Sequence, residues 1–227
     1  MSSPISRDRR HKAHQQINPP THQPSPSSPK VEERATLMID MMMETKEIPA
    51  WVIQLMRRYY PDDNALWHIL YTHSALVAER ALLVCDRHAE LGLDRGFVAE
   101  AAMLHDIGIF RCHAPGIQCF GSEPYLLHGR IGADLLRAEG YPRHARVCER
   151  HTGAGLAVED IVAQNLPLPH QSFMPETLEE KVICYADKFY SKTHLERERT
   201  PGQVAKSLER FGHDGVRRFE EWHKMFG

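Results

Sequence analysis

The chain has 227 residues, of which 42% are hydrophobic and 26% are charged, a balance typical of a water-soluble globular domain. It contains no run of about 18 apolar residues, so it offers no candidate membrane span. Its five cysteines include no Cys-x-x-Cys pair, which argues against zinc-finger and disulfide scaffolds and indicates free thiols in a reducing compartment. The net charge of −2 divides into +4 over residues 1–30 (five basic residues against one acidic) and hence −6 over the rest, which is unfavourable for a nucleic-acid groove. We therefore expect a cytoplasmic protein that binds neither a membrane nor nucleic acid.

Residues 1–30 carry six prolines among serines, glutamines and histidines, with almost no large aliphatic side chain. Such a segment cannot bury enough apolar surface to offset the ordering of the chain, so we expect a disordered extension whose histidines are solvated. It lacks the apolar centre of a secretory signal peptide. Its basic, acid-poor composition leaves an organellar transit peptide open, although no amphipathic helix is visible.

From Val31 onward the hydrophobic pattern is helical, and it predicts one all-α domain over residues 31–227. Helices are expected around 37–42, from Pro49 at a first helical position, over 65–91 with Gly92 closing the helix, and from an Asp94 N-cap to His105-Asp106. Gly108 is expected to supply the left-handed residue that ends this last helix. Later helices are predicted over 128–139, 142–151, 160–165, 178–192 and 201–227. No alternating strand and no repeat is visible.

Two irregular segments interrupt the helices, at 107–127 and 166–177, and both are rich in proline or glycine. Irregular segments of this length inside a compact domain are more often functional than not. We therefore expect the two segments to form the rim of a pocket.

Several polar side chains fall on stripes that are otherwise apolar. Val98, Ala101, Ala102 and His105 are spaced i, i+3, i+4 and i+7, so His105 faces the core with the rest of its stripe. The same reasoning turns four further residues inward: His73, His128, His151 and Asp187. Asp106 adjoins His105, and a buried carboxylate is costly unless it is paired or bound to a metal.

A single inward histidine is usually a core residue whose hydrogen bonds are satisfied. Four histidines and two aspartates from five helices are an implausible set of independent buried polar groups, whereas divalent metal would compensate all of them together. Helical bundles do host carboxylate and imidazole metal sites. The residues therefore predict a metal site in the core, over residues 65–192.

The run Leu104-His105-Asp106-Ile107-Gly108 resembles the signature of the HD superfamily of metal-dependent phosphohydrolases. The order His73, His105-Asp106, His128, His151, Asp187 is similar to the His, His-Asp, His, His, Asp series of its dinuclear branch. That branch includes di-iron diadenosine tetraphosphate hydrolases, cyclic di-nucleotide phosphodiesterases and mixed-valent di-iron oxygenases. The resemblance implies an HD-domain helical bundle with two divalent ions.

By this resemblance Asp106 would bridge the two ions, with His73, His105 and Asp187 holding one and His128 and His151 the other. Such ligands suit iron, manganese, zinc or nickel. The nucleophile would be a metal-activated hydroxide rather than a side chain.

The chain departs from the family pattern in ways that affect the substrate contacts. Ile109 stands where many members carry a lysine, so Lys188 becomes the first candidate to steady a phosphate and to act with Asp106 in catalysis. Lys192, one helical turn further on, and Arg111 are further substrate-binding candidates. The Gly-Tyr-Pro extension of the cyclic di-nucleotide branch is absent. Thr152 and Gly153 are similar to the His-Thr-x-Gly pattern of the tetraphosphate hydrolases, with one residue fewer before the glycine.

The resemblance thus implies a phosphohydrolase that cleaves a phosphate ester or anhydride in a small, nucleotide-like substrate, and the sequence leaves the oligomeric state open. Two alternatives remain. The same ligands can hold a mixed-valent di-iron pair that activates oxygen, or the chain can be a non-catalytic helical binding protein with a structural metal. Turnover without oxygen separates the first alternative from hydrolysis, and normal binding after substitution of the ligands would indicate the second.

Overall fold

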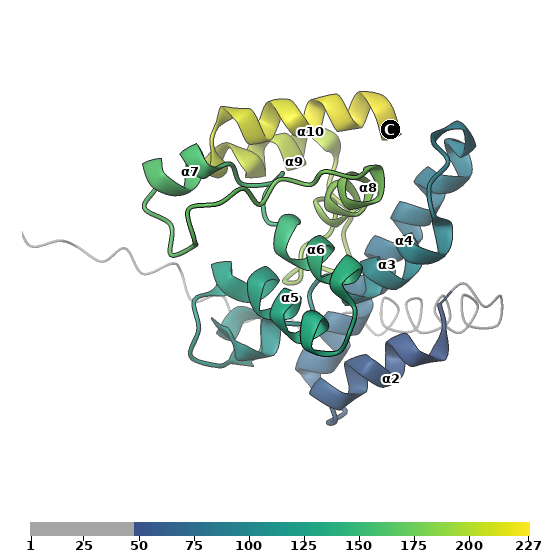
Figure 1. Ribbon diagram of the computed structural model, residues 1–227, viewed down its shortest axis with the longest axis vertical. Coiled ribbons are helices and arrows are strands. Elements are labelled where there is room, and N and C mark those ends of the chain that lie inside the picture. Colours follow the sequence, from purple (N-terminus) through teal and green to yellow (C-terminus); the bar gives the residue numbers. More distant parts are fainter. Residues whose placement is uncertain (1–47) are drawn as a thin grey trace, which may run out of the picture.

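The computed structural model describes residues 48–227, which Figure 1 shows in colour. The extension expected over 1–30 and the helix expected around 37–42 lie outside the described residues. The helices are α2 (Ala50–Tyr59), α3 (Ala65–Arg87), α4 (Arg95–Leu104), α5 (His128–Ala138), α6 (Pro142–Arg150), α7 (Val158–Ala163), α8 (Leu178–Asp187), α9 (Pro201–Leu208) and α10 (His213–Phe226). The all-α fold is confirmed.

The helices pack in pairs around α8. α3 lies against α4 and α8, α5 lies against α6, and α10 lies against α8 and α9, which Figure 1 shows at the top of the molecule. One hydrophobic cluster runs from Ile48 before α2 to Phe226 at the end of α10. Tyr185 joins α8 to α10, because its buried ring stacks on Phe219 of α10 with the ring centroids 5.5 Å apart.

Side-chain caps fix where several helices begin. The Asp94 carboxylate accepts a hydrogen bond from the Phe97 N–H at 3.1 Å, which confirms the predicted N-cap. Asn64 caps α3 in the same way, through Trp67 N–H at 3.0 Å. Pro49 is the N-cap of α2 rather than its first helical residue.

Three predicted helix ends are wrong. α3 stops at Arg87, and a 3-10 turn follows it over Ala89–Leu91. Gly92, with a φ of 60°, ends this turn. α8 stops at Asp187, five residues before the predicted end. The helix expected over 201–227 is two helices, because the chain turns through Gly212 with a φ of 96°.

The first irregular segment contains a small hairpin that the sequence pattern did not predict. Strand β1 (His113–Ala114) pairs antiparallel with β2 (Cys119–Phe120). A 3-10 turn (Pro115–Ile117) connects the two strands, and two others (Ile109–Arg111 and Tyr125–Leu127) precede and follow the hairpin. Strands of two residues are too short to show an alternating pattern, which is why hydrophobic spacing does not reveal them.

Gly108 is not left-handed, so the prediction for this residue is wrong. Its φ is −84° and its ψ is −5°, a conformation open to any residue. A Cβ atom at this position would lie 2.3 Å from the His128 carbonyl oxygen and 2.4 Å from the Gly132 backbone nitrogen. The glycine therefore lets α5 approach the His105-Asp106 turn closely, and this approach brings His128 to the site.

Within residues 48–227, no helix combines the length and the apolar character that crossing a membrane requires.

Candidate metal centre

The six predicted ligands come from five elements and converge in the interior. His73 lies within α3, His105 directly after α4, His128 at the start of α5, His151 directly after α6 and Asp187 at the end of α8, while Asp106 follows His105 in the chain. Their exposed fractions range from 0 to 8%. The structure thus brings together residues that are up to 114 positions apart.

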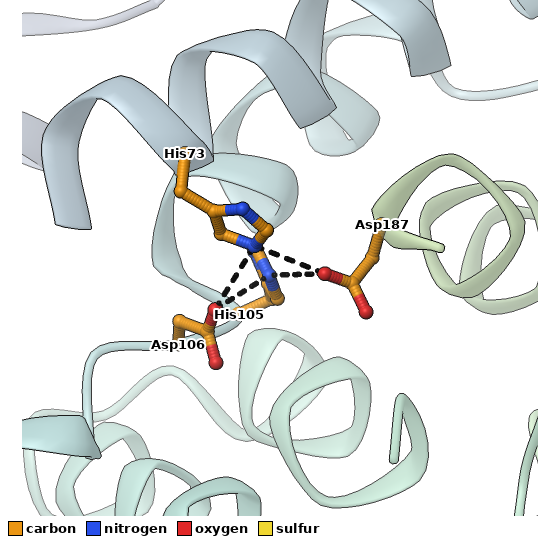
Figure 2. Close-up of side chains that lie close together, drawn as sticks. All are labelled: His73, His105, Asp106 and Asp187. Atoms are coloured by element: carbon orange, nitrogen blue, oxygen red, sulfur yellow. Dashed lines mark hydrogen bonds and ion pairs between the residues drawn. The ribbon is translucent and has the colours of Figure 1, made fainter. Parts of the chain in front are cut away.

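The first group consists of His73, His105, Asp106 and Asp187, whose side chains point toward one another in Figure 2. His73 Nε2 lies 3.2 Å from Asp106 Oδ2 and 3.0 Å from Asp187 Oδ1. His105 Nε2 lies 3.0 Å and 3.5 Å from the same two oxygens. Two nitrogens and two oxygens therefore surround one point.

The second group consists of Asp106, His128 and His151. The other carboxylate oxygen of Asp106, Oδ1, lies 3.3 Å from His128 Nε2 and 3.4 Å from His151 Nε2. The two Nε2 atoms are 3.0 Å apart. Asp106 thus belongs to both groups and turns one oxygen to each.

Backbone carbonyls fix the tautomers of three of these histidines. The Nδ1 atoms of His105, His128 and His151 lie 2.7, 2.6 and 2.7 Å from the carbonyl oxygens of Ala102, Tyr125 and Cys148. A carbonyl oxygen only accepts, so each Nδ1 carries a proton and donates it. In the neutral form of each ring, Nε2 carries the lone pair and faces the site, as in histidines that bind metal.

The donor atoms at the site fit a cation. Burial lowers the pKa of His128 to about 3 and also lowers the pKa of His151, so both rings are neutral and their Nε2 lone pairs face each other. The Asp106 carboxylate is fully buried, and its Oδ1 faces these two lone pairs without a hydrogen bond from a described residue. Facing lone pairs and a carboxylate oxygen without a hydrogen bond are costly alone and are satisfied by a divalent ion.

Two lysines balance the carboxylates at the edge of the site. Lys192 Nζ lies 2.5 Å from Asp106 Oδ2, and Lys188 Nζ donates to Asp187 Oδ2 at 2.5 Å and to the His151 carbonyl at 2.8 Å. Burial alone would raise the pKa of both aspartates. The charges of Lys192 and His105 hold the pKa of Asp106 well below its usual range, and the charge of Lys188 does the same for Asp187.

The site opens into a cavity of about 610 Å³, a size that suits a small organic ligand. His128, His151 and Asp187 lie in its wall together with both lysines. The segment at 107–127 contributes Tyr125, whose ring stacks on His128 with the centroids 4.6 Å apart. The segment at 166–177, by contrast, does not line the cavity.

Not every predicted contact reaches this cavity. Arg111 is exposed and absent from the cavity wall, so the structure does not bring it to the other candidates. Lys192 does reach the site, although from the turns after α8 rather than from the predicted further helical turn. The sequence reasoning missed Tyr125 and Arg199 in the wall, because both lie outside regular α-helices, where hydrophobic spacing carries no signal.

Comparison with known proteins reveals relatives that share part of the chain. A tRNA (cytidine(56)-2'-O)-methyltransferase of Picrophilus torridus is 35% identical over 145 residues, 61% of this chain and 39% of that protein. A protein of the same name from Thermoplasma volcanium is 32% identical over 141 residues, 58% and 37% of the two chains. An uncharacterized protein of Methanocaldococcus jannaschii is 35% identical over 126 residues, 55% and 65% of the two chains. The chain thus spans less than two thirds of the length of each relative.

Among solved structures, the HD domain of the phosphodiesterase PgpH of L. monocytogenes aligns with 74% of this chain and 93% of its own, at a TM-score of 0.43 and 15% identity. Residues 70–191, more than half of the chain, match the HD domain family. These residues include all six of the converging histidines and aspartates. The chain therefore belongs to the HD domain family.

Proposed function

We propose that this protein is a metal-dependent phosphohydrolase that cleaves a phosphate ester or anhydride bond in a small, nucleotide-like substrate. The observation that carries the proposal is the position of Asp106, whose two oxygens face two different groups of nitrogen and oxygen donors. Membership of the HD domain family and a cavity with two lysines in its wall support it.

The proposed centre holds two divalent ions, of iron, manganese, zinc or nickel. His73, His105 and Asp187 would hold one ion and His128 and His151 the other, with Asp106 between them. Two such ions lower the pKa of a water molecule and polarise the oxygens of a phosphate, which is the chemistry that hydrolysis needs.

The residues of the chain have separate roles in this proposal. Asp106 and the four histidines would hold the centre, and the carbonyl-bound Nδ1 atoms of His105, His128 and His151 prevent these three rings from turning. Lys188 and Lys192 lie in the cavity wall with their ammonium groups beside the carboxylates, where they would bind the negative oxygens of the phosphate. The Tyr125 ring and the aliphatic wall would exclude bulk water. Arg111, which is outside the cavity, takes no part.

A His128→Gln variant tests whether the centre holds two ions. The substitution removes one of the two nitrogens of the second group and leaves the first group untouched, so the metal content should fall from two ions per chain to one. Elemental analysis of anaerobically purified protein measures this. His113→Gln, at an exposed position on β1, is the matched control and should keep two ions. A wild-type protein with one ion, or a variant that keeps two, would contradict the dinuclear centre.

A Lys192→Met variant tests the proposed reaction. We expect the wild-type protein to release phosphate or a nucleoside monophosphate from members of a nucleotide and phosphate-ester panel without oxygen. The variant should lose about 100-fold in kcat/KM, the range found when one charge-stabilising donor is removed, and it should keep its metal. Steady-state kinetics and elemental analysis measure the two quantities.

The control for this variant is Lys206→Met, an exposed lysine of α9 outside the cavity, which should retain full activity. Absence of turnover over the whole panel, with metal bound, would refute the hydrolase. Consumption of oxygen during turnover would instead indicate the di-iron oxygenase.

We also propose a cytoplasmic location. All five cysteines are buried and unpaired, as in proteins of a reducing compartment.

A further inference from the structure

The cavity wall is strongly basic beyond the two lysines at the metal centre. Arg199 and Arg210 also line it, whereas Asp187 is the one carboxylate among its lining residues in the described part of the chain. Lys188 and Lys192 already face Asp187 and Asp106. Both lysines thus lie at the metal centre, so charge for a ligand group away from that centre has to come from elsewhere in the wall, and Arg199, in the segment before α9, is placed to supply it.

The Arg199 backbone is held in place on both sides, but no carboxylate of the described residues pairs with its charge. Its backbone N–H donates to the Phe189 carbonyl at 2.8 Å, which ties it to the turn after α8. The next residue, Thr200, caps α9 by accepting a hydrogen bond from the Gln203 N–H at 3.3 Å. Within residues 48–227 no carboxylate lies within 4.0 Å of the half-buried Arg199 guanidinium. A fixed backbone with an unpaired guanidinium is prepared for an external anion, because little order is lost on binding.

Hydroxyl groups accompany this charge. Ser191 and Thr193 line the same cavity, and their hydroxyls lie 2.9 Å apart in a hydrogen bond with each other, which leaves one of the two protons for a ligand, whereas the Ser207 hydroxyl donates to the Val204 carbonyl. A phosphate oxygen accepts from hydroxyls as well as from a guanidinium, whose planar fork matches two oxygens at once. Around Arg199 the described part of the wall thus offers hydrogen-bond donors and no carboxylate that would repel a phosphate.

We propose that Arg199, with the Ser191 and Thr193 hydroxyls, forms a second phosphate subsite, so that the substrate carries another phosphate group besides the one attacked at the metal centre. This inference rests on the proposed hydrolase function and narrows its substrate to compounds with at least two phosphates. A cavity of about 610 Å³ has room for both groups.

Calorimetric titration with inorganic anions tests the subsite without turnover. Phosphate, pyrophosphate and tripolyphosphate are titrated into the metal-loaded full chain and into Arg199→Gln. The variant should bind phosphate as the wild type does, and it should bind at least one of the longer anions about tenfold or more weakly, the effect of losing a charge-assisted hydrogen bond. Arg197→Gln makes the same charge change two residues away, outside the main cavity, and should bind all three anions like the wild type.

The outcomes separate this inference from the proposed function. Equal affinity of Arg199→Gln and Arg197→Gln for every anion overturns the subsite, even if the wild type hydrolyses phosphate esters. An Arg199-dependent preference for the longer anions supports the subsite, even if no nucleotide is hydrolysed. Equal kcat/KM of the wild type for matched substrates with one and with two phosphates would also overturn it.

Discussion

Replacing Asp106 with asparagine should remove both metal binding and turnover. The side chain is fully buried, and its two oxygens lie between 3.0 and 3.4 Å from the Nε2 atoms of all four histidines of the site. Asparagine has the same shape but carries no charge, and its amide nitrogen cannot act as a ligand. One proposed ion would lose its ligand and the other would keep only a neutral amide oxygen, and we expect kcat/KM to fall by about 1000-fold or more, since the proposed centre would supply both the nucleophile and the charge stabilisation. Elemental analysis and steady-state kinetics measure the two losses.

The same substitution leaves Lys192 without its carboxylate, because the ammonium lies 2.5 Å from Asp106 Oδ2. Breaking a buried ion pair from one side costs about 3–5 kcal/mol, so circular dichroism must first show that the variant is folded. Asp134→Asn, which removes an exposed carboxylate on α5, is the matched control and should change nothing. A folded Asp106→Asn protein that keeps both ions would refute the proposed centre, whatever its activity.

The six site residues could be predicted because each one belongs to an apolar helical stripe or lies next to the end of one. His73 illustrates this: the spacing of its neighbours on α3 places it inward, and it is fully buried. The pattern does not tell which atoms meet. That Asp106 turns Oδ1 to His128 and Oδ2 to His73 depends on the turn after α4 and on the packing of α5, which are tertiary features.

The residues of the cavity wall were harder to predict for the same reason. Lys192 was expected one helical turn past Lys188, but α8 ends at Asp187, and the lysine reaches Asp106 from the turns that follow. Arg199 lies between two helices, tied by its backbone to Phe189. Such contacts join segments through loops, and neither hydrophobic period nor capping residues in the sequence specify them.

Gly108→Ala should destabilise the protein strongly, although alanine can adopt the backbone conformation of Gly108 (φ −84°, ψ −5°). The new Cβ would lie 2.3 Å from the His128 carbonyl oxygen, and these are backbone atoms that cannot turn aside. Relief requires α5 to move away from the His105-Asp106 turn. We expect a loss of about 3 kcal/mol or more in the free energy of unfolding, at the upper end for overpacking, measured by urea unfolding. Metal binding by the second group should weaken too, because His128 moves with α5.

Substitutions at two other glycines, Gly96 and Gly92, show whether close packing or a left-handed backbone makes a glycine necessary. Gly96→Ala in α4 places its Cβ at an ordinary distance of 3.8 Å from Asp94 and should be neutral or stabilising by up to about 1 kcal/mol. Gly92 has a φ of +60° with open space around it, so Gly92→Asn should be tolerated, since asparagine visits this region readily. Gly108→Asn should be at least as harmful as Gly108→Ala, because its longer side chain meets the same backbone atoms. If the urea midpoint of Gly108→Asn instead equals that of the wild-type protein, close packing against α5 is not the reason for a glycine at position 108.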